Sequence, residues 1–311
     1  MQFTPAGVVP AALMPWTPDM AMDLPGLRRH LSDLAGVRGV TAVCVNGHAS
    51  EVVACTEDEQ AAILATAVDE IGSRLPVVGG VCSESSLVAA SHARRWTALG
   101  ASALLVVPPS TFAKGAQLRP EMVVEHYSRI AAATDLPLIV FQYSAASGQA
   151  HSLETLLRLA ETIPTVRAIK DYCGDPVLHE QTVRHLQNGP RRVNVLTAHS
   201  SWLLSSLALG CAGILSGAGS TIAPLQVELF EAMQAGDLSR AREVAERIDV
   251  PNRLFYRPPL ADQHNRMKEA QVLMGRFAHA AVRPPLMKLP AAEIAALRAG
   301  LLRAGLIAEE R

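Results

Sequence analysis

Lysine is scarce in this chain of 311 residues, which contains 28 Lys plus Arg but only four lysines: Lys114, Lys170, Lys268 and Lys288. Arginine stays protonated, whereas a desolvated lysine can lose its proton and add to a carbonyl as a Schiff base. Lys170 stands where an apolar, strand-like run ends. It is therefore a candidate nucleophile. The alternative is a lysine that reaches solvent from a strand end or pairs with Asp171.

Other absences exclude whole classes of protein. The five cysteines include no Cys-x-x-Cys pair, so we expect reduced thiols of a cytoplasmic protein and neither a zinc site nor a disulfide framework. A formal charge of -1 without a basic cluster argues against a nucleic-acid partner. No window offers about 18 uninterrupted apolar residues, so no membrane span is expected. The first residues also lack the basic start and apolar run of a signal peptide.

Short apolar runs alternate with segments of helical spacing through residues 1–235. The runs are continuous, as expected of parallel strands that are buried on both faces. Eight such units of this total length favour a (β/α)8 barrel, the TIM-barrel fold, over an open doubly wound sheet. The predicted strands cover residues 7–13, 40–45, 77–81, 103–107, 138–143, 166–170, 193–197 and 213–216.

The remainder, residues 236–311, contains no strand-like run and is expected to form a C-terminal helical extension. Its spacing predicts three helices over 238–255, 260–276 and 291–304. Arg257-Pro258-Pro259 and Arg283-Pro284-Pro285 separate them, because proline interrupts a helix. The sequence therefore predicts a barrel that carries the active site and a three-helix extension.

Several polar side chains follow the predicted strands. In a barrel of this kind the chemistry sits where the strands end. Those ends supply the amine of Lys170, the imidazoles of His48 and His199, the phenol of Tyr143 and a small-residue loop at 216–220. An amine, proton-transfer groups and free backbone N–H groups suit carbonyl chemistry on an oxo acid.

A metal site is the alternative for the same rim, because His48, Glu51, Asp171 and His199 all lie near it. Metal-dependent barrel hydrolases usually carry His-x-His after the first strand. Here that segment is Met14-Pro15-Trp16-Thr17, which offers no ligand. We therefore expect no metal and no other cofactor.

Three segments at the strand ends have a distinctive spacing: Gly47-His48-Ala49-Ser50-Glu51, Ala168-Ile169-Lys170-Asp171, and Gly210-Cys211-Ala212-Gly213-Ile214-Leu215-Ser216. Together they resemble the dihydrodipicolinate synthase/N-acetylneuraminate lyase family of Schiff-base aldolases. The resemblance covers almost the whole chain. It implies that the lysine forms an imine with pyruvate and that the first segment, Gly-x-x-Gly-Glu in the family, holds the carboxylate of the oxo acid. It also implies a homotetramer built as a dimer of dimers.

The chain departs from the family pattern at several positions. The strand-five tyrosine that shuttles protons aligns with Phe141, which has no proton to transfer. Tyr143 faces the same side two residues on, and His48 replaces a family threonine, so one of these two would move the protons. The positions at which the dihydrodipicolinate synthases carry a strand-four tyrosine and a substrate-binding arginine fall near Ser110 and Thr111 and near Ala146, so both side chains are missing from this chain. Lysine biosynthesis is therefore not the expected task.

We predict a lyase of the pyruvate-dependent class I aldolase type, in which Lys170 attacks a 2-oxo acid and Tyr143 or His48 moves protons. A dehydratase of a 2-oxo-3-deoxy sugar acid, using the same imine, is one alternative. A non-catalytic barrel that binds oxo acids is another. The carboxylate is expected at Ala49 and Ser50, with Glu51 holding the loop. Other expected substrate contacts are Leu215, Ser216 and Gly217. A neutral, hydroxylated or aromatic substrate tail, and not a second carboxylate, is expected against Phe141, Tyr143, Ser144, Ser147, Gln149 and His199.

Overall fold

Eight parallel strands form the centre of the computed structural model, which describes residues 3–308. The strand order is β1-β8-β7-β6-β5-β4-β3-β2. Bridges Val8–Val40 and Ala11–Cys44 join β1 to β2 and close the barrel. The predicted (β/α)8 barrel is confirmed. The strands are β1 (Gly7–Pro10), β2 (Val43–Val45), β3 (Val77–Cys82), β4 (Ala103–Val107), β5 (Leu138–Gln142), β6 (Val166–Asp171), β7 (Asn194–Thr197) and β8 (Gly213–Ser216).

The first two strands are shorter than predicted. Strand-like runs extend over residues 7–13 and 40–45, but continuous pairing is limited to Gly7–Pro10 and Val43–Val45. The seam between β1 and β2 is made of isolated bridges, so the flanking apolar residues are buried without belonging to a ladder. Burial therefore preserves the apolar pattern beyond the ends of the hydrogen-bonded strands.

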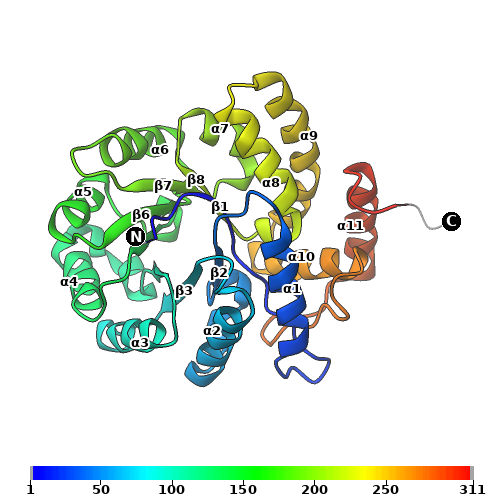
Figure 1. The fold of residues 1–311 in the computed structure, drawn as a ribbon, viewed down its shortest axis with the longest axis horizontal. Coiled ribbons are helices and arrows are strands. Elements are labelled where there is room, and N and C mark those ends of the chain that lie inside the picture. Colours follow the sequence, from blue (N-terminus) through cyan, green and yellow to red (C-terminus); the bar gives the residue numbers. More distant parts are fainter. Residues whose placement is uncertain (1–2, 309–311) are drawn as a thin grey trace.

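Helices α1 to α8 surround the strands (Figure 1). In α2 the entry is set by a capping box, in which Thr56 accepts from the N–H of Glu59 and the Glu59 carboxylate accepts from the N–H of Thr56. No helix within residues 3–308 is long and apolar enough to cross a membrane. The helices are α1 (Leu24–Gly36), α2 (Glu57–Ile71), α3 (Ser86–Ala98), α4 (Pro120–Ala131), α5 (Leu153–Thr162), α6 (Pro176–Thr182), α7 (Leu203–Ala208) and α8 (Gly219–Gln234).

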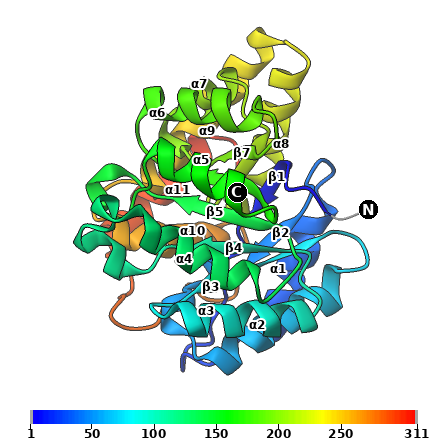
Figure 2. The same cartoon turned by 90° about the vertical axis from the view of Figure 1, so that its left-hand side faces the viewer.

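The C-terminal extension consists of α9 (Leu238–Phe255), α10 (Gln263–Leu273) and α11 (Ala291–Arg303), gathered on one side of the barrel (Figures 1 and 2). The bounds of α9 agree with the prediction. The second helix was predicted over 260–276, but α10 begins later because Leu260–Asp262 forms a separate 3-10 turn, and it ends three residues earlier, at Leu273. The division of the chain into a barrel domain, residues 1–235, and this extension, residues 236–311, stays a prediction.

A buried arginine fixes the link between α9 and α10. The guanidinium of Arg266 donates to the backbone carbonyls of Phe255, Arg257 and Pro259 and pairs with Glu293. These bonds satisfy carbonyls of an irregular segment that would otherwise be buried without partners. They hold the start of α10 at a fixed place beside the barrel.

Candidate active site

Lys170 lies near the end of β6 and is 7% exposed. Its Nζ is 4.1 Å from the centroid of the Phe141 ring. No carboxylate within residues 3–308 forms an ion pair with it. Burial lowers the pKa of Lys170 to about 8, against a weaker opposite effect from the Cys44 thiol. The amine is therefore buried, unpaired and readily deprotonated, as a Schiff-base nucleophile requires.

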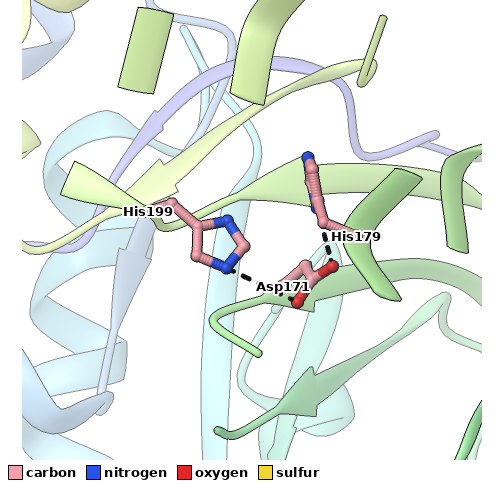
Figure 3. Close-up of side chains that lie close together, drawn as sticks. All are labelled: Asp171, His179 and His199. Atoms are coloured by element: carbon pink, nitrogen blue, oxygen red, sulfur yellow. Dashed lines mark hydrogen bonds and ion pairs between the residues drawn. The ribbon is translucent and has the colours of Figure 1, made fainter. Parts of the chain in front are cut away.

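Asp171, the next residue along β6, points away from Lys170, because successive strand residues face opposite sides. Its carboxylate accepts from Nδ1 of His179 at 2.8 Å and from the N–H of Cys173 at 2.8 Å (Figure 3). Burial opposes ionisation of Asp171, but the bond from His179, the two nearby imidazoles and the N–H of Cys173 together hold the pKa of Asp171 below its usual range. Burial lowers the pKa of His179, but the bond and charge of Asp171 together with those of Cys211 outweigh it and raise that pKa to about 9. The alternative ion pair between Lys170 and Asp171 is thus not formed.

His199 belongs to this buried group, although it was expected at the substrate. Its Nε2 accepts from the N–H of Gly174 and lies 3.9 Å from Asp171. The ligand atoms of Asp171, His179 and His199 lie within 4.8 Å of one another. However, His179 also bonds Ser206 through Nε2 at 2.8 Å. A metal ion would have to displace these hydrogen bonds. They brace the ends of β6 and β7, and that role accounts for the cluster without a metal ion.

The pair formed by His48 and Tyr143 faces the amine. The Tyr143 hydroxyl and His48 Nε2 are hydrogen-bonded, and the Tyr143 ring stacks on Phe141 at 4.4 Å. Burial raises the pKa of Tyr143 and, together with the charge of Lys170, lowers the pKa of His48 to about 4. The phenol therefore carries its proton and the imidazole is neutral at neutral pH. Nδ1 of His48 is buried without a hydrogen-bond partner in the described structure.

The loop after β2 forms a 3-10 turn, His48–Ser50, whose first backbone N–H groups have no partner inside the turn. These belong to His48 and Ala49 and are suited to an anion. The hydroxyl of Ser50 instead donates to the carbonyl of Ala12 at 2.8 Å and accepts from the N–H of Asn46. Its proton is already used, so a bond from Ser50 to a substrate carboxylate would require the hydroxyl to turn.

Glu51 holds the end of that loop. Its backbone φ is 52°, in the left-handed region. Its carboxylate pairs with the buried Lys268 and accepts from the N–H of Arg283 at 3.2 Å. The carboxylate thus faces the C-terminal extension, and its predicted part in the substrate site is limited to holding the loop.

The strand-eight segment contributes mainly through Gly217. Leu215 and Ser216 are buried in β8, and the Ser216 carbonyl accepts from the N–H of Ala11. A Cβ on Gly217 would lie 3.1 Å from Nε2 of His264, so a larger residue would crowd that imidazole. Gly217 leaves room for a side chain from the extension to reach the amine.

A cavity of about 90 Å³ brings these groups together. The predicted residues His48, Phe141, Tyr143, Lys170 and Gly217 line it, whereas His199 does not. Sequence reasoning missed the other lining residues, which are Tyr172, Ala198, Tyr256, Gln263 and His264.

Three of the missed residues come from the extension: Tyr256, Gln263 and His264. The Tyr256 hydroxyl accepts from the N–H of Ala218 at 3.2 Å. Burial and the nearby charges lower the pKa of His264 to about 3. The proline break between α9 and α10 was the only signal in the sequence that this segment turns back toward the barrel.

Known proteins similar to this chain match nearly its whole length. The model of the dihydrodipicolinate synthetase family matches residues 4–303. An uncharacterized DapA-like lyase of Halobacterium salinarum is 33% identical, over 97% of this chain and 94% of its own. A 4-hydroxy-tetrahydrodipicolinate synthase of Methanopyrus kandleri is 31% identical, over 99% of both chains.

A solved structure shows the same fold. The prophage protein YagE of E. coli K12, a member of the same family determined in complex with pyruvate, has a TM-score of 0.89 and 23% identity. The match covers 97% of this chain and 99% of that one. With the family model matching nearly the whole length and relatives above 30% identity, this chain belongs to the dihydrodipicolinate synthetase family.

Proposed function

We propose that the protein is a Schiff-base lyase in which Lys170 forms an imine with a 2-oxo acid and a carbon–carbon bond is then cleaved or formed. The observation that carries the proposal is the Lys170 amine, buried without a carboxylate partner among residues 3–308 and lining a cavity with a hydrogen-bonded imidazole and phenol. A structural lysine would have its charge compensated. A nucleophilic one needs the opposite environment.

The neutral amine of Lys170 attacks C2 of the oxo acid, and loss of water from the carbinolamine gives a protonated imine. In cleavage, the C3–C4 bond breaks as the C4 hydroxyl loses its proton, and the bond electrons move into the imine to give an enamine. Protonation at C3 and hydrolysis of the imine then release pyruvate and the free lysine. The imine serves as the electron sink, so no cofactor is needed.

Tyr143 and His48 move the protons in this scheme. A phenol with a raised pKa donates to the neutral Nε2 of His48, which places the ring proton of His48 on Nδ1. The pair can therefore return a proton to the carbinolamine oxygen and take one back during hydrolysis. Phe141 provides a ring surface beneath the amine but has no proton to transfer, so the proton transfer falls to Tyr143, which stacks on it.

A dihydrodipicolinate synthase is not the activity we propose. Near Ser110 and Ala146 the chain lacks the tyrosine and arginine of those enzymes, and the hydroxyl and backbone N–H of Ser110 bond the carboxylate of Glu84. Two alternatives use the same barrel. A dehydratase would release water and retain the carbon chain, whereas a non-catalytic binder would hold the oxo acid without an imine.

Imine trapping tests the proposal. The protein is incubated with pyruvate, reduced with borohydride, digested and weighed by mass spectrometry. An adduct on the peptide that holds Lys170 is expected, and an aldehyde assay with longer 2-oxo acids separates cleavage from dehydration. No adduct, together with pyruvate affinity retained in Lys170→Ala, would favour the non-catalytic binder.

The assembly and location are further proposals. We propose a homotetramer, a dimer of dimers, in the cytoplasm. Light scattering tests the assembly, and a monomer at working concentration would contradict it.

A further inference from the structure

A second cavity lies beside the one that holds Lys170. It has a volume of about 250 Å³, nearly three times that of the Lys170 cavity. One wall is the 3-10 turn η2 (Val52–Ala54), and the other belongs to the extension, at the turn η8 (Leu260–Asp262) and at 284–286. Its apolar lining residues are Val52, Val53, Ala54, Leu260, Ala261, Pro284, Pro285 and Leu286.

Three side chains line both cavities and form the partition between them: His48, Gln263 and His264. The side chains of Gln263 and His264 make no hydrogen bond with any other residue of 3–308. No hydrogen bond has to be broken when these two side chains turn aside or bind a substrate oxygen. A molecule attached to Lys170 can thus extend between them into the second cavity.

The charged groups of the second cavity are already neutralised. Arg283 donates to both carboxylate oxygens of Glu59 at 2.7 Å and to the carbonyl of Ala54. Glu51 pairs with Lys268. Neither charge is left for a ligand, so a charged tail would lose its hydration without gaining a partner of opposite charge.

The sequence predicted that the substrate tail lies against Ser147, Gln149 and His199, but the hydrogen-bonding groups of these side chains are already used. The Ser147 hydroxyl donates to the carbonyl of Ser144, and the Gln149 amide donates to the carbonyl of Pro108. His199 is buried in the network around Asp171. These side chains therefore stabilise the loop after β5 and the ends of the strands.

We propose that the second cavity binds the tail of the substrate, and that the natural substrate is therefore a 2-oxo acid with an uncharged, predominantly apolar tail. This inference rests on the Schiff-base function proposed above. The carboxylate would lie at the backbone N–H groups of His48 and Ala49, C2 at Lys170, and the tail would pass Gln263 and His264. The extension would then set substrate specificity while the barrel supplies the chemistry.

The test measures imine formation, which does not require the natural substrate. The concentration of 2-oxo acid that gives half-maximal borohydride trapping on Lys170 is determined for pyruvate, 2-oxobutanoate, 2-oxohexanoate and 2-oxooctanoate. We expect it to fall roughly fourfold for each methylene that enters the cavity. 2-Oxoadipate, which differs from 2-oxohexanoate only in its terminal carboxylate, is expected to bind at least tenfold more weakly than 2-oxohexanoate.

Two variants locate the tail. Leu260→Asp places a charge at the wall, and Ala261→Trp fills the cavity without charge. In either variant the preference for 2-oxooctanoate over pyruvate is expected to fall at least tenfold. Leu238→Asp is the matched control, since Leu238 is 45% exposed and Leu260 is 46% exposed. Leu238 begins α9, does not line the second cavity and should leave the preference unchanged.

Each outcome has one meaning. Trapping of pyruvate with no gain from longer tails overturns the tail site and leaves the Schiff-base function standing. A gain that persists in both Leu260→Asp and Ala261→Trp places the tail elsewhere and also overturns it. The absence of an adduct with every 2-oxo acid overturns both proposals.

Discussion

Two buried lysines of this chain have opposite surroundings. Lys170 is 7% exposed and Lys268 is 0% exposed, and burial lowers the pKa of each to about 8. Each also lies near an aromatic ring, Phe141 or Trp16. However, Lys268 is bonded to the carboxylate of Glu51 and donates to a backbone carbonyl, whereas Lys170 faces a cavity and has no carboxylate partner in the described part of the chain.

The difference shows that a lowered pKa alone does not identify a nucleophile. Burial desolvates both amines. The ammonium of Lys268, however, donates to Glu51 and so links α10 to the loop after β2. Lys170 has space in front of it for a carbonyl and proton-transfer groups within the same cavity. Reactivity therefore follows from the missing partner and the open space together.

Removing the two amines should separate chemistry from stability. Lys170→Met is expected to abolish imine trapping and to reduce turnover by about a thousandfold or more, because no other amine of the described residues lines the cavity. Mass spectrometry after borohydride reduction and steady-state assays measure this. Lys114→Met, in the 3-10 turn at Ser110–Lys114, is the control and should trap normally. Full trapping in Lys170→Met would contradict the assignment.

Lys268→Met should act on stability. It leaves the Glu51 carboxylate buried without its partner, so we expect the free energy of unfolding to fall by about 3–5 kcal/mol. Urea unfolding measures this, and Glu51→Gln combined with Lys268→Met should recover part of the loss. Lys170→Met is the matched control, because its removal leaves no carboxylate unpaired. Equal losses in Lys170→Met and Lys268→Met would remove the distinction between the lysines.

Tyrosine substitutions refine the environment of Lys170. Tyr143→Phe keeps the ring but removes the phenol bonded to His48, so turnover should fall about a hundredfold while imine trapping persists. Tyr127→Phe is the control, since the Tyr127 hydroxyl is buried without a partner in the described structure. An undiminished rate in Tyr143→Phe would leave His48 or His264 as the proton carrier.

Much of the fold followed from the sequence because its signals are local. Continuous apolar runs and helical spacing mark buried parallel strands and amphipathic helices wherever they occur. All eight strands of the barrel were predicted, and the bounds of α9 agree with its pattern. The ends of β1 and β2 were predicted too far out, because apolar residues stay buried beyond the last hydrogen bond between the strands.

The candidate site was only half accessible to sequence reasoning. Residues that follow a strand are placed by the barrel itself, which is how Lys170, His48 and Tyr143 were found. By contrast, Gln263 and His264 reach the cavity through the tertiary contacts of Arg266, and nothing local to their sequence encodes that approach. His199 shows the converse, since a strand-end residue can turn outward into a buried network.

The pH dependence of imine formation tests the environment of Lys170 most finely. An ordinary lysine has a pKa of 10.5, and that of Lys170 is lowered to about 8. Only the neutral amine attacks, so the rate should rise about tenfold per unit below pH 8 and level off above it. At pH 7 roughly 10% of the amine is then neutral, far more than for a free lysine. Stopped-flow imine formation with pyruvate measures the profile. A rate that kept rising to pH 10 would contradict the lowered pKa and mean that the Lys170 ammonium keeps its charge as an ordinary lysine does.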